Sequence, residues 1–252
     1  MTRFKVGVQI RPQHCEMADL RKAWKAADEL GVDTIWTWDH FYPLFGPEDG
    51  AHFECWTMLA AIAADTSHAQ FGALVTCNSY RNPDLLADMA RTVDQISGGR
   101  LILGIGSGWF ERDYTEYGYE FGTAPERLRA LRAALPRIES RLAKLNPAGQ
   151  EIPVMIGGSG EKVTLKLVAK HAQLWNAFGP PENFARKNQI LNDWCAELGR
   201  DPLEIDRTCM INTADVDNVE AFLEAGATHI IYGLDTPFDL KPVEKLLEAA
   251  RG

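Results

Sequence analysis

The sequence has no long apolar run and no excess of positive charge. No stretch approaches the roughly 20 apolar residues that a membrane-spanning helix needs. Residues 1–3 lead directly into a predicted strand and not into a signal peptide. The net charge of −9 argues against nucleic acid or an anionic membrane surface as the main partner. These absences indicate a protein of the cytoplasm.

Paired cysteines and metal-ligand spacings are absent as well. The five cysteines are widely scattered and odd in number, which predicts reduced thiols and no disulfide or zinc framework. No combination of His, Cys and carboxylate residues has the spacing of a metal site, and no Gly-x-Ser-x-Gly elbow occurs. The sequence therefore argues against a metal hydrolase and a serine hydrolase.

What is present is a regular alternation of strand and helix patterns along one domain, residues 1–252. Strands are predicted at 4–10, 34–38, 70–76, 153–156, 174–178, 205–212 and 228–232, and a further short apolar strand begins at Leu101 and runs into the glycines of 104–108. Helices are predicted at 16–30, 54–64, 83–97, 123–145, 161–172, 181–198, 219–225 and 243–251, and Pro136 is expected to kink or split the fifth. Eight strand–helix repeats in this length predict a closed (β/α)8 barrel of the TIM type, an α/β fold. An open doubly wound sheet usually stops at five or six strands.

Polar residues and glycines follow several of these strands, at the barrel end where such folds carry their active sites. They comprise Asp39 and His40, residues 76–79, residues 107–111, residues 157–161, Asn176 and Asn212. His40 is a candidate proton donor or acceptor because imidazole titrates near neutral pH. A purely structural role for it is the alternative.

Two glycine-rich stretches are candidate cofactor contacts. Residues 104–108 spell Gly-Ile-Gly-Ser-Gly before Trp109, so the backbone can approach a ligand without interference from Cβ atoms. Residues 110–118 are predicted to form a polar, aromatic loop after them. Residues 157–160 spell Gly-Gly-Ser-Gly before a predicted helix, where free N–H groups suit a phosphate, and Glu161 falls in the first turn. In both stretches, tight turns with nothing bound are the alternative.

Taken in order, these motifs resemble the bacterial-luciferase-like oxidoreductases, and most closely their actinobacterial coenzyme F420-dependent branch. The resemblance covers nearly the whole chain. It rests on residues 38–41 (Trp-Asp-His-Phe), 82–83 (Asn-Pro), 97–100 (Ser-Gly-Gly-Arg), 103–109, 117–118 (Tyr-Gly) and 153–161. It implies hydride transfer between a deazaflavin and a small organic substrate, and a homodimer.

The resemblance also implies roles for individual residues. Asp39 would hydrogen-bond the deazaflavin ring, and His40 would stand near the substrate. A non-prolyl cis peptide is expected at Ala73–Leu74, within about one residue. Thr76, Gly106, Ser107, Gly108 and Trp109 would line the ring, and Gly157, Gly158, Ser159, Gly160 and Glu161 would surround the cofactor phosphate.

One departure from the family pattern concerns catalysis. The sugar-phosphate dehydrogenases of this family have a catalytic glutamate directly after the last glycine, where this chain has Trp109. Glu111, two residues further on, is the candidate replacement. Two other functions fit the motifs: an FMN-dependent monooxygenase working with a reductase, and a non-catalytic flavin-binding barrel.

Overall fold

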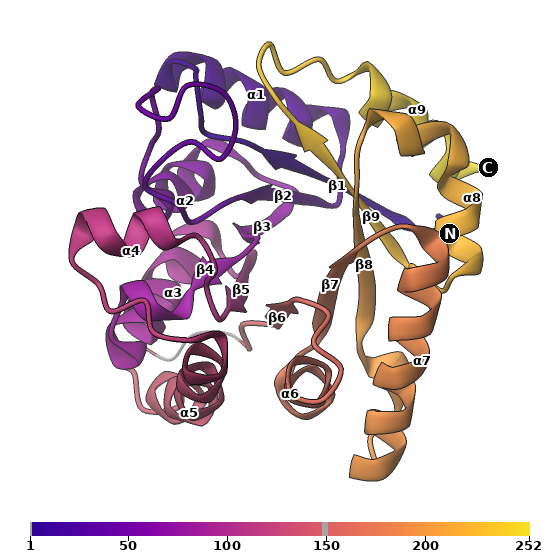
Figure 1. Cartoon of the computed structure of the whole chain (residues 1–252). Coiled ribbons are helices and arrows are strands. Elements are labelled where there is room, and N and C mark those ends of the chain that lie inside the picture. The colour runs from indigo at the N-terminus through magenta and orange to yellow at the C-terminus, as the bar shows by residue number, and fades with distance from the viewer. Residues whose placement is uncertain (1, 148–150) are drawn as a thin grey trace.

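The strands form a closed parallel barrel in a computed structural model that describes residues 2–147 and 151–252 (Figure 1). They are hydrogen-bonded in the order β3-β2-β1-β9-β8-β7-β6-β5-β4, and a pairing of β3 with β5 closes the ring. Their bounds are β1 Lys5–Ile10, β2 Thr34–Thr37, β3 Gln70–Ala73, β4 Thr76–Cys77, β5 Leu101–Gly106, β6 Val154–Gly157, β7 Leu174–Phe178, β8 Asp206–Ile211 and β9 His229–Leu234. The predicted strand 70–76 is interrupted, so β3 and β4 share one of eight barrel positions.

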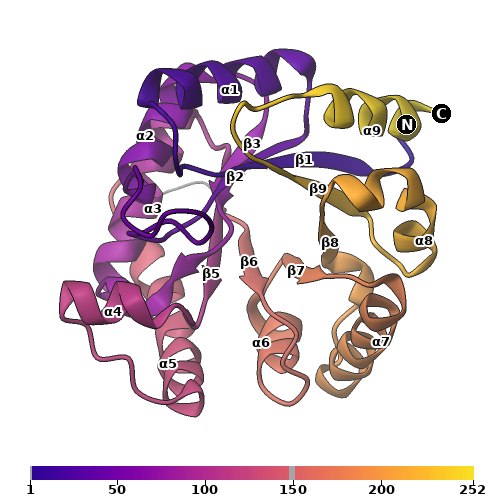
Figure 2. The same cartoon turned by 45° about the horizontal axis from the view of Figure 1, so that its top comes forward.

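The helices form the outer ring (Figure 2). They are α1 Met17–Leu30, α2 Cys55–Asp65, α3 Pro83–Ser97, α4 Glu111–Tyr117, α5 Ala124–Leu142, α6 Thr164–His171, α7 Pro181–Leu198, α8 Val219–Glu224 and α9 Lys241–Arg251. The helix patterns read from the sequence are confirmed, with ends that shift by up to three residues. All five cysteines are free and buried. In the described parts of the chain, no helix has the length and apolarity to cross a membrane.

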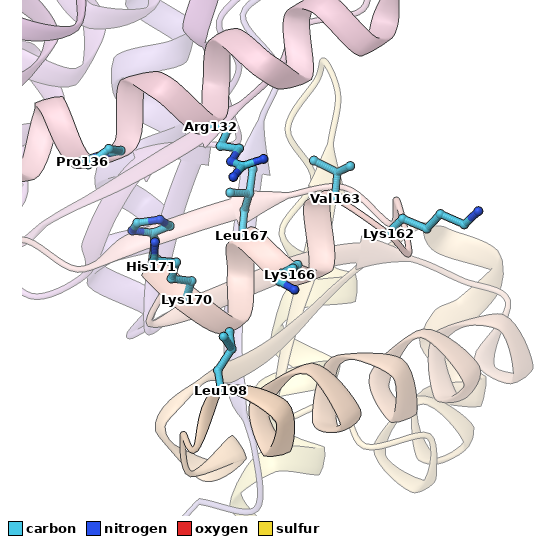
Figure 3. A pocket seen from close by; sticks show the side chains of 9 residues that line it. All are labelled: Arg132, Pro136, Lys162, Val163, Lys166, Leu167, Lys170, His171 and Leu198. Carbon is cyan, nitrogen blue, oxygen red and sulfur yellow. The ribbon is translucent and has the colours of Figure 1, made fainter.

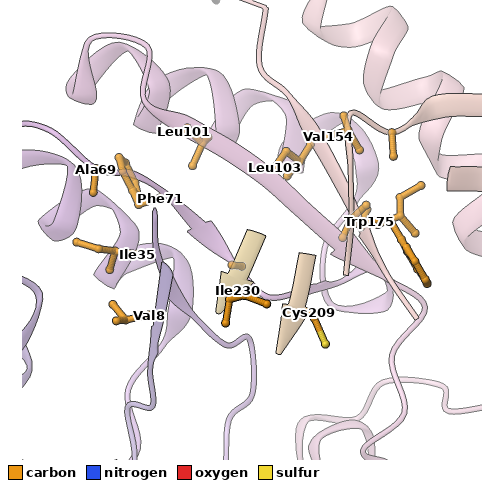
Figure 4. Close-up of a cluster of buried hydrophobic side chains, with 14 of the residues drawn as sticks. Val8, Ile35, Ala69, Phe71, Leu101, Leu103, Val154, Trp175, Cys209 and Ile230 are labelled. Carbon is orange, nitrogen blue, oxygen red and sulfur yellow. The ribbon is translucent and has the colours of Figure 1, made fainter. Parts of the chain in front are cut away.

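The core has two layers because successive strand residues point to opposite faces. Outward-pointing side chains pack beneath the helices, and Figure 4 labels Val8, Ile35, Phe71, Leu101, Trp175 and Ile230 among them. Inward-pointing side chains fill the barrel: Trp36, Leu74, Ile102, Met155, Leu174, Met210 and Ile231, with Val75 packed against them. This inner plug forms the floor on which any ligand at the barrel mouth would lie.

One expectation about helices was wrong. Residues 111–117 form the helix α4, not a loop. Glu111 and Asp113 lie in its first turn, where carboxylates favour a helix, and Gly118 ends it in the left-handed conformation at φ 70°. Pro136 does not split α5, which continues to Leu142. Pro136 has no N–H group, so the carbonyl oxygen of Arg132 loses its helical hydrogen bond. Both residues lie on the exposed face of the helix, where water can supply the missing hydrogen bond.

Replacing Gly104 should destabilise the barrel. A Cβ atom at this position would lie 1.9 Å from the carbonyl oxygen of Ala73, a backbone atom that cannot turn aside. We expect Gly104→Ala to lower the free energy of unfolding by about 3 kcal/mol, measured by urea denaturation. Gly98→Ala is the matched control, because nothing lies within 4 Å of a Cβ there and only the positive φ of 72° is unfavourable, about 1 kcal/mol. Equal losses in the two variants would contradict the close approach.

Candidate functional site

A cavity of about 260 Å³ opens at the carboxyl ends of the strands. Its walls come from β1, β4, β5, β6, β7 and β8 and from the segments that follow β2, β3, β4, β5 and β6. The lining residues are Gln9, Asp39, His40, Leu74, Val75, Cys77, Tyr80, Gly106, Ser107, Gly108, Trp109, Gly157, Gly158, Asn176, Phe178 and Met210. This position agrees with the barrel end at which the sequence analysis places the chemistry.

A larger basin of about 490 Å³ lies on the outside of the helix ring, between α5, α6 and α7 (Figure 3). Several cationic side chains line it, but His171 pairs with Glu139 and Lys166 pairs with Glu197. None of the residues predicted for the active site lies in it. We therefore assign the candidate site to the cavity at the barrel mouth.

The cavity brings together most of the predicted residues, and it also contains residues that the sequence analysis missed. Lining it are Asp39, His40, Leu74, Gly106, Ser107, Gly108, Trp109, Gly157 and Gly158. Ala73, Thr76, Glu111, Ser159, Gly160 and Glu161 are not among the lining residues. Missed were Gln9, Val75, Tyr80, Phe178 and Met210. Only Gln9 carried a usable signal, an amide in an otherwise apolar strand.

The glycines accommodate the protein's own side chains. Val75 projects between two of them: a Cβ would lie 2.7 Å from Val75 Cγ2 at Gly106 and 2.9 Å from Val75 Cγ1 at Gly157. The expected non-prolyl cis peptide is Leu74–Val75, one residue beyond the predicted position. The side-chain amide of Gln9 donates to the Leu74 carbonyl oxygen at 3.0 Å. The glycine pattern thus allows the segment between β3 and β4 to project into the barrel mouth.

Asp39 forms a buried ion pair below the cavity. Its two carboxylate oxygens accept hydrogen bonds from both terminal nitrogens of Arg81, at 2.6 and 3.0 Å, and the Cys77 N–H adds a third at 3.0 Å. Arg81 also donates to Glu54 at 2.7 Å. Burial, the largest influence, raises the pKa of Asp39, and the bonds from Arg81 act against it. A direct contact of Asp39 with a cofactor ring stays a prediction.

His40 is held by a second buried carboxylate. Its Nδ1 lies 2.7 Å from Oδ2 of Asp113, which is completely buried. The Tyr80 hydroxyl donates to the same oxygen at 2.8 Å, and the Phe41 N–H donates to Oδ1 at 3.0 Å. The imidazole is 12% exposed, and its Nε2 has no hydrogen-bond partner among the described residues. This nitrogen is therefore available to a ligand in the cavity.

Trp109 stands at the position of the family's glutamate, and Glu111 is its candidate replacement. Trp109 lies at the rim of the cavity, and Glu111 lies outside it. Glu111 is exposed in the first turn of α4 and does not line the cavity. Trp109 lines the rim with 63% of its surface exposed, and its ring meets that of His40 edge to face, with centroids 5.8 Å apart. Within the cavity wall, His40 is thus better placed for proton exchange than Glu111.

The loop between β6 and α6 differs from the expectation in two ways. The helix begins at Thr164, so Glu161 precedes it and is not in its first turn. Glu161 pairs with Lys187 and Arg186, each at 2.6 Å, and these bonds lower its pKa to about 2. The Gly158 N–H is already bonded to the Asn176 carbonyl oxygen at 3.0 Å. A phosphate role for this loop stays a prediction that would depend on its other N–H groups.

Three buried polar atoms near the strand ends have no partner within residues 2–147 and 151–252. They are the hydroxyl oxygens of Thr37 and Thr76 and the side-chain oxygen of Asn78. Buried polar groups are nearly always hydrogen-bonded, but none of these three residues lines the cavity, so they do not define a ligand site in it. The fit for a planar ring rests instead on the cavity wall, where Val75 and the flanking glycines Gly106 and Gly157 form an apolar surface.

The family model for luciferase-like monooxygenases matches residues 1–251 of the chain. The chain belongs to this family. Its barrel resembles that of an F420-dependent secondary alcohol dehydrogenase solved with an F420–acetone adduct, at a TM-score of 0.87 and 16% identity, over 99% of this chain and 100% of that one. A coenzyme F420-dependent tetrahydromethanopterin reductase from Methanopyrus kandleri gives a TM-score of 0.77 at 18% identity, over 99% and 98%. At these identities the likeness establishes the fold.

Sequence relatives from actinobacteria are named as oxidoreductases. The phthiodiolone/phenolphthiodiolone dimycocerosates ketoreductase of Mycobacterium tuberculosis is 29% identical, over 81% of this chain and 64% of its own length. The F420-dependent glucose-6-phosphate dehydrogenase of Amycolatopsis mediterranei is 32% identical, over 54% and 40%. The matches thus cover less than two thirds of either relative.

The buried ion pair below the cavity should be strongly coupled. Removing Arg81 leaves the buried carboxyl group of Asp39 without its ion-pair partner, so we expect Arg81→Met to lower the free energy of unfolding by about 3–5 kcal/mol. Adding Asp39→Asn removes that carboxyl group, and this double variant should recover at least half of the loss. Urea denaturation of the two single variants and the double variant measures the coupling. Additive losses would show that the pair contributes little.

Proposed function

We propose that the protein is a coenzyme F420-dependent oxidoreductase that transfers a hydride between the deazaflavin and a small organic substrate. The observation that carries the proposal is the imidazole of His40, which lines the cavity with Nε2 unpaired and Nδ1 tied to a buried carboxylate. Family membership supports an oxidoreductase. The relatives named as F420-dependent favour the deazaflavin over FMN.

The chain's own residues supply the ring site. Val75, with Gly106 and Gly157 on either side, forms an apolar backing that a planar ring would lie against. Ser107 lines the same cavity and would face the polar edge of the ring. Asp39, held by Arg81, would place negative charge below it. Ser159 and Gly160 are the candidates for phosphate contact.

The chemistry then divides between the cofactor and His40. When bound, the deazaflavin supplies the hydride donor or acceptor. Hydride transfer to a carbonyl carbon leaves an oxygen that must gain a proton, and the reverse reaction removes that proton. His40 Nε2 would give or take it, because His40 lines the cavity and this nitrogen has no hydrogen-bond partner among the described residues. Trp109 and Phe178, 63% and 64% exposed at the rim, would exclude water from a bound substrate.

Cofactor preference tests the proposal directly. We expect the purified protein to bind F420 at least tenfold more tightly than FMN, a difference of about 1.4 kcal/mol, in a fluorescence titration. Tighter binding of FMN would favour the monooxygenase alternative. Binding without turnover on a panel of secondary alcohols and ketones would favour the non-catalytic barrel.

Substitution of His40 tests its role. We expect His40→Asn to lower the turnover number by at least about a hundredfold, because general acid–base catalysis contributes roughly 10²–10⁴-fold. The affinity for F420 should stay within a few-fold, since the imidazole acts on the substrate. Glu111→Gln is the control and should keep turnover within about threefold, because Glu111 is exposed outside the cavity. If the His40 variant instead loses the cofactor and keeps its rate per bound cofactor, His40 is a ring-binding residue.

A further inference from the structure

The carboxylate of Asp113 receives three hydrogen bonds in the interior of the protein. A carboxylate can only accept hydrogen bonds, so each of its partners must donate. The Phe41 N–H occupies Oδ1, and the Tyr80 hydroxyl and His40 Nδ1 share Oδ2. Burial raises the pKa of the Tyr80 phenol well above its usual value, so Tyr80 keeps its proton and donates. His40 must then carry a proton on Nδ1, which leaves Nε2 as its proton-exchanging atom.

The aromatic surroundings of His40 restrain the ring without choosing between its two nitrogens. Trp38, Trp109 and Phe110 each meet it edge to face, with centroids 5.9, 5.8 and 5.5 Å away and interplanar angles of 86°, 74° and 83°. A half-turn of the imidazole about its Cβ–Cγ bond exchanges Nδ1 with Cδ2 and Nε2 with Cε1, and it would preserve these contacts because they depend on the ring's plane. The bond from Nδ1 to Asp113 is the contact that distinguishes the two orientations.

The position of Asp113 is itself well anchored. It is the third residue of α4, and its neighbour Tyr114 is also completely buried. The Tyr114 hydroxyl lies 3.1 Å from Cys77 Sγ, and its ring packs against that of Tyr80 with centroids 5.2 Å apart. The first turn of α4 is thereby fixed against the segment that follows β4. A carboxylate that is held in place can orient a histidine, because the carboxylate does not move when the imidazole ring moves.

We infer that Asp113 is a positioning residue that fixes the tautomer of His40 and directs its Nε2 into the cavity. The inference rests on the function proposed above, in which His40 exchanges a proton with the substrate. It adds a residue of α4, outside the cavity wall, to the groups that the reaction requires. Tyr80 supports Asp113 by donating to the same oxygen and has no direct bond to His40.

The substitution Asp113→Asn tests this role because an amide has one acceptor and one donor side. The buried Phe41 N–H requires the amide oxygen, which leaves the NH₂ group facing His40 and Tyr80. The NH₂ group can only donate, so His40 Nδ1 must accept and its proton must move to Nε2. In ¹⁵N NMR spectra of histidine-labelled protein without cofactor, we expect His40 to change from the Nδ1–H to the Nε2–H tautomer. The spectrum of His40→Asn identifies its signals among the six histidines.

Kinetics and a matched control complete the experiment. With F420 and the alcohol and ketone panel, Asp113→Asn should lower kcat by at least about a hundredfold and leave KM and the affinity for F420 within about threefold. Glu116→Gln makes the same carboxylate-to-amide change at an exposed position of α4, and it should keep the Nδ1–H tautomer and kcat within about threefold. Thermal unfolding of both variants shows whether each remains folded.

The outcomes separate this inference from the proposed function. An unchanged His40 tautomer in Asp113→Asn overturns the inference, as does a loss of kcat no larger than that of Glu116→Gln. If the parent protein binds no F420, the proposed function fails, and the tautomer measurement still decides whether Asp113 orients His40. If Asp113→Asn does not fold, the tautomer of His40 in the parent protein decides: the Nε2–H form would overturn the inference.

Discussion

The close packing of Val75 between two glycines is the constraint on which the barrel mouth depends. Val75 belongs to the segment between β3 and β4, where the third barrel position is interrupted. Its side chain fits there because Gly106 and Gly157 have no Cβ atoms, each of which would lie within 3 Å of it. Gly104 admits the preceding carbonyl of Ala73 in the same way. Glycines of β5 and β6 therefore shape the floor of the cavity indirectly. They make room for the segment between β3 and β4, which would lie between them and any ligand.

The two buried carboxylates of the site, Asp39 and Asp113, have different partners and different electrostatic roles. Asp39 is paired with Arg81 through two hydrogen bonds, and this pair contributes to the shape and stability of the site. Asp113 has no arginine or lysine partner among the described residues and receives neutral donors and the imidazole of His40. An ion pair in a low-dielectric interior resists any change in charge. A carboxylate facing an imidazole instead stabilises the cation that forms when His40 takes up a proton, which suits a proton-transfer role.

Much of this arrangement was predictable from local patterns. Period-two apolar stretches and Gly31, Gly98 and Gly199 in left-handed helix caps locate the strands and helices to within a few residues. Eight strand–helix repeats then imply a barrel, and a barrel implies a site at the carboxyl ends of its strands. Asp39, His40 and the two glycine stretches were found in this way because each directly follows a strand or ends one.

The remaining features were not predictable because they depend on contacts between distant segments. Val75 and Tyr80 are ordinary residues in the sequence, and only barrel closure places them at the cavity. Asp113 fell within residues that resembled a loop, because a seven-residue helix stabilised by burying Asp113 and Tyr114 has little periodic signal. The sequence by itself determined the barrel and the strand ends that carry its polar residues, since these follow from local periodicity. Tertiary structure decided which charges are paired and which nitrogen of His40 faces the cavity, because each of these depends on a partner from another part of the chain.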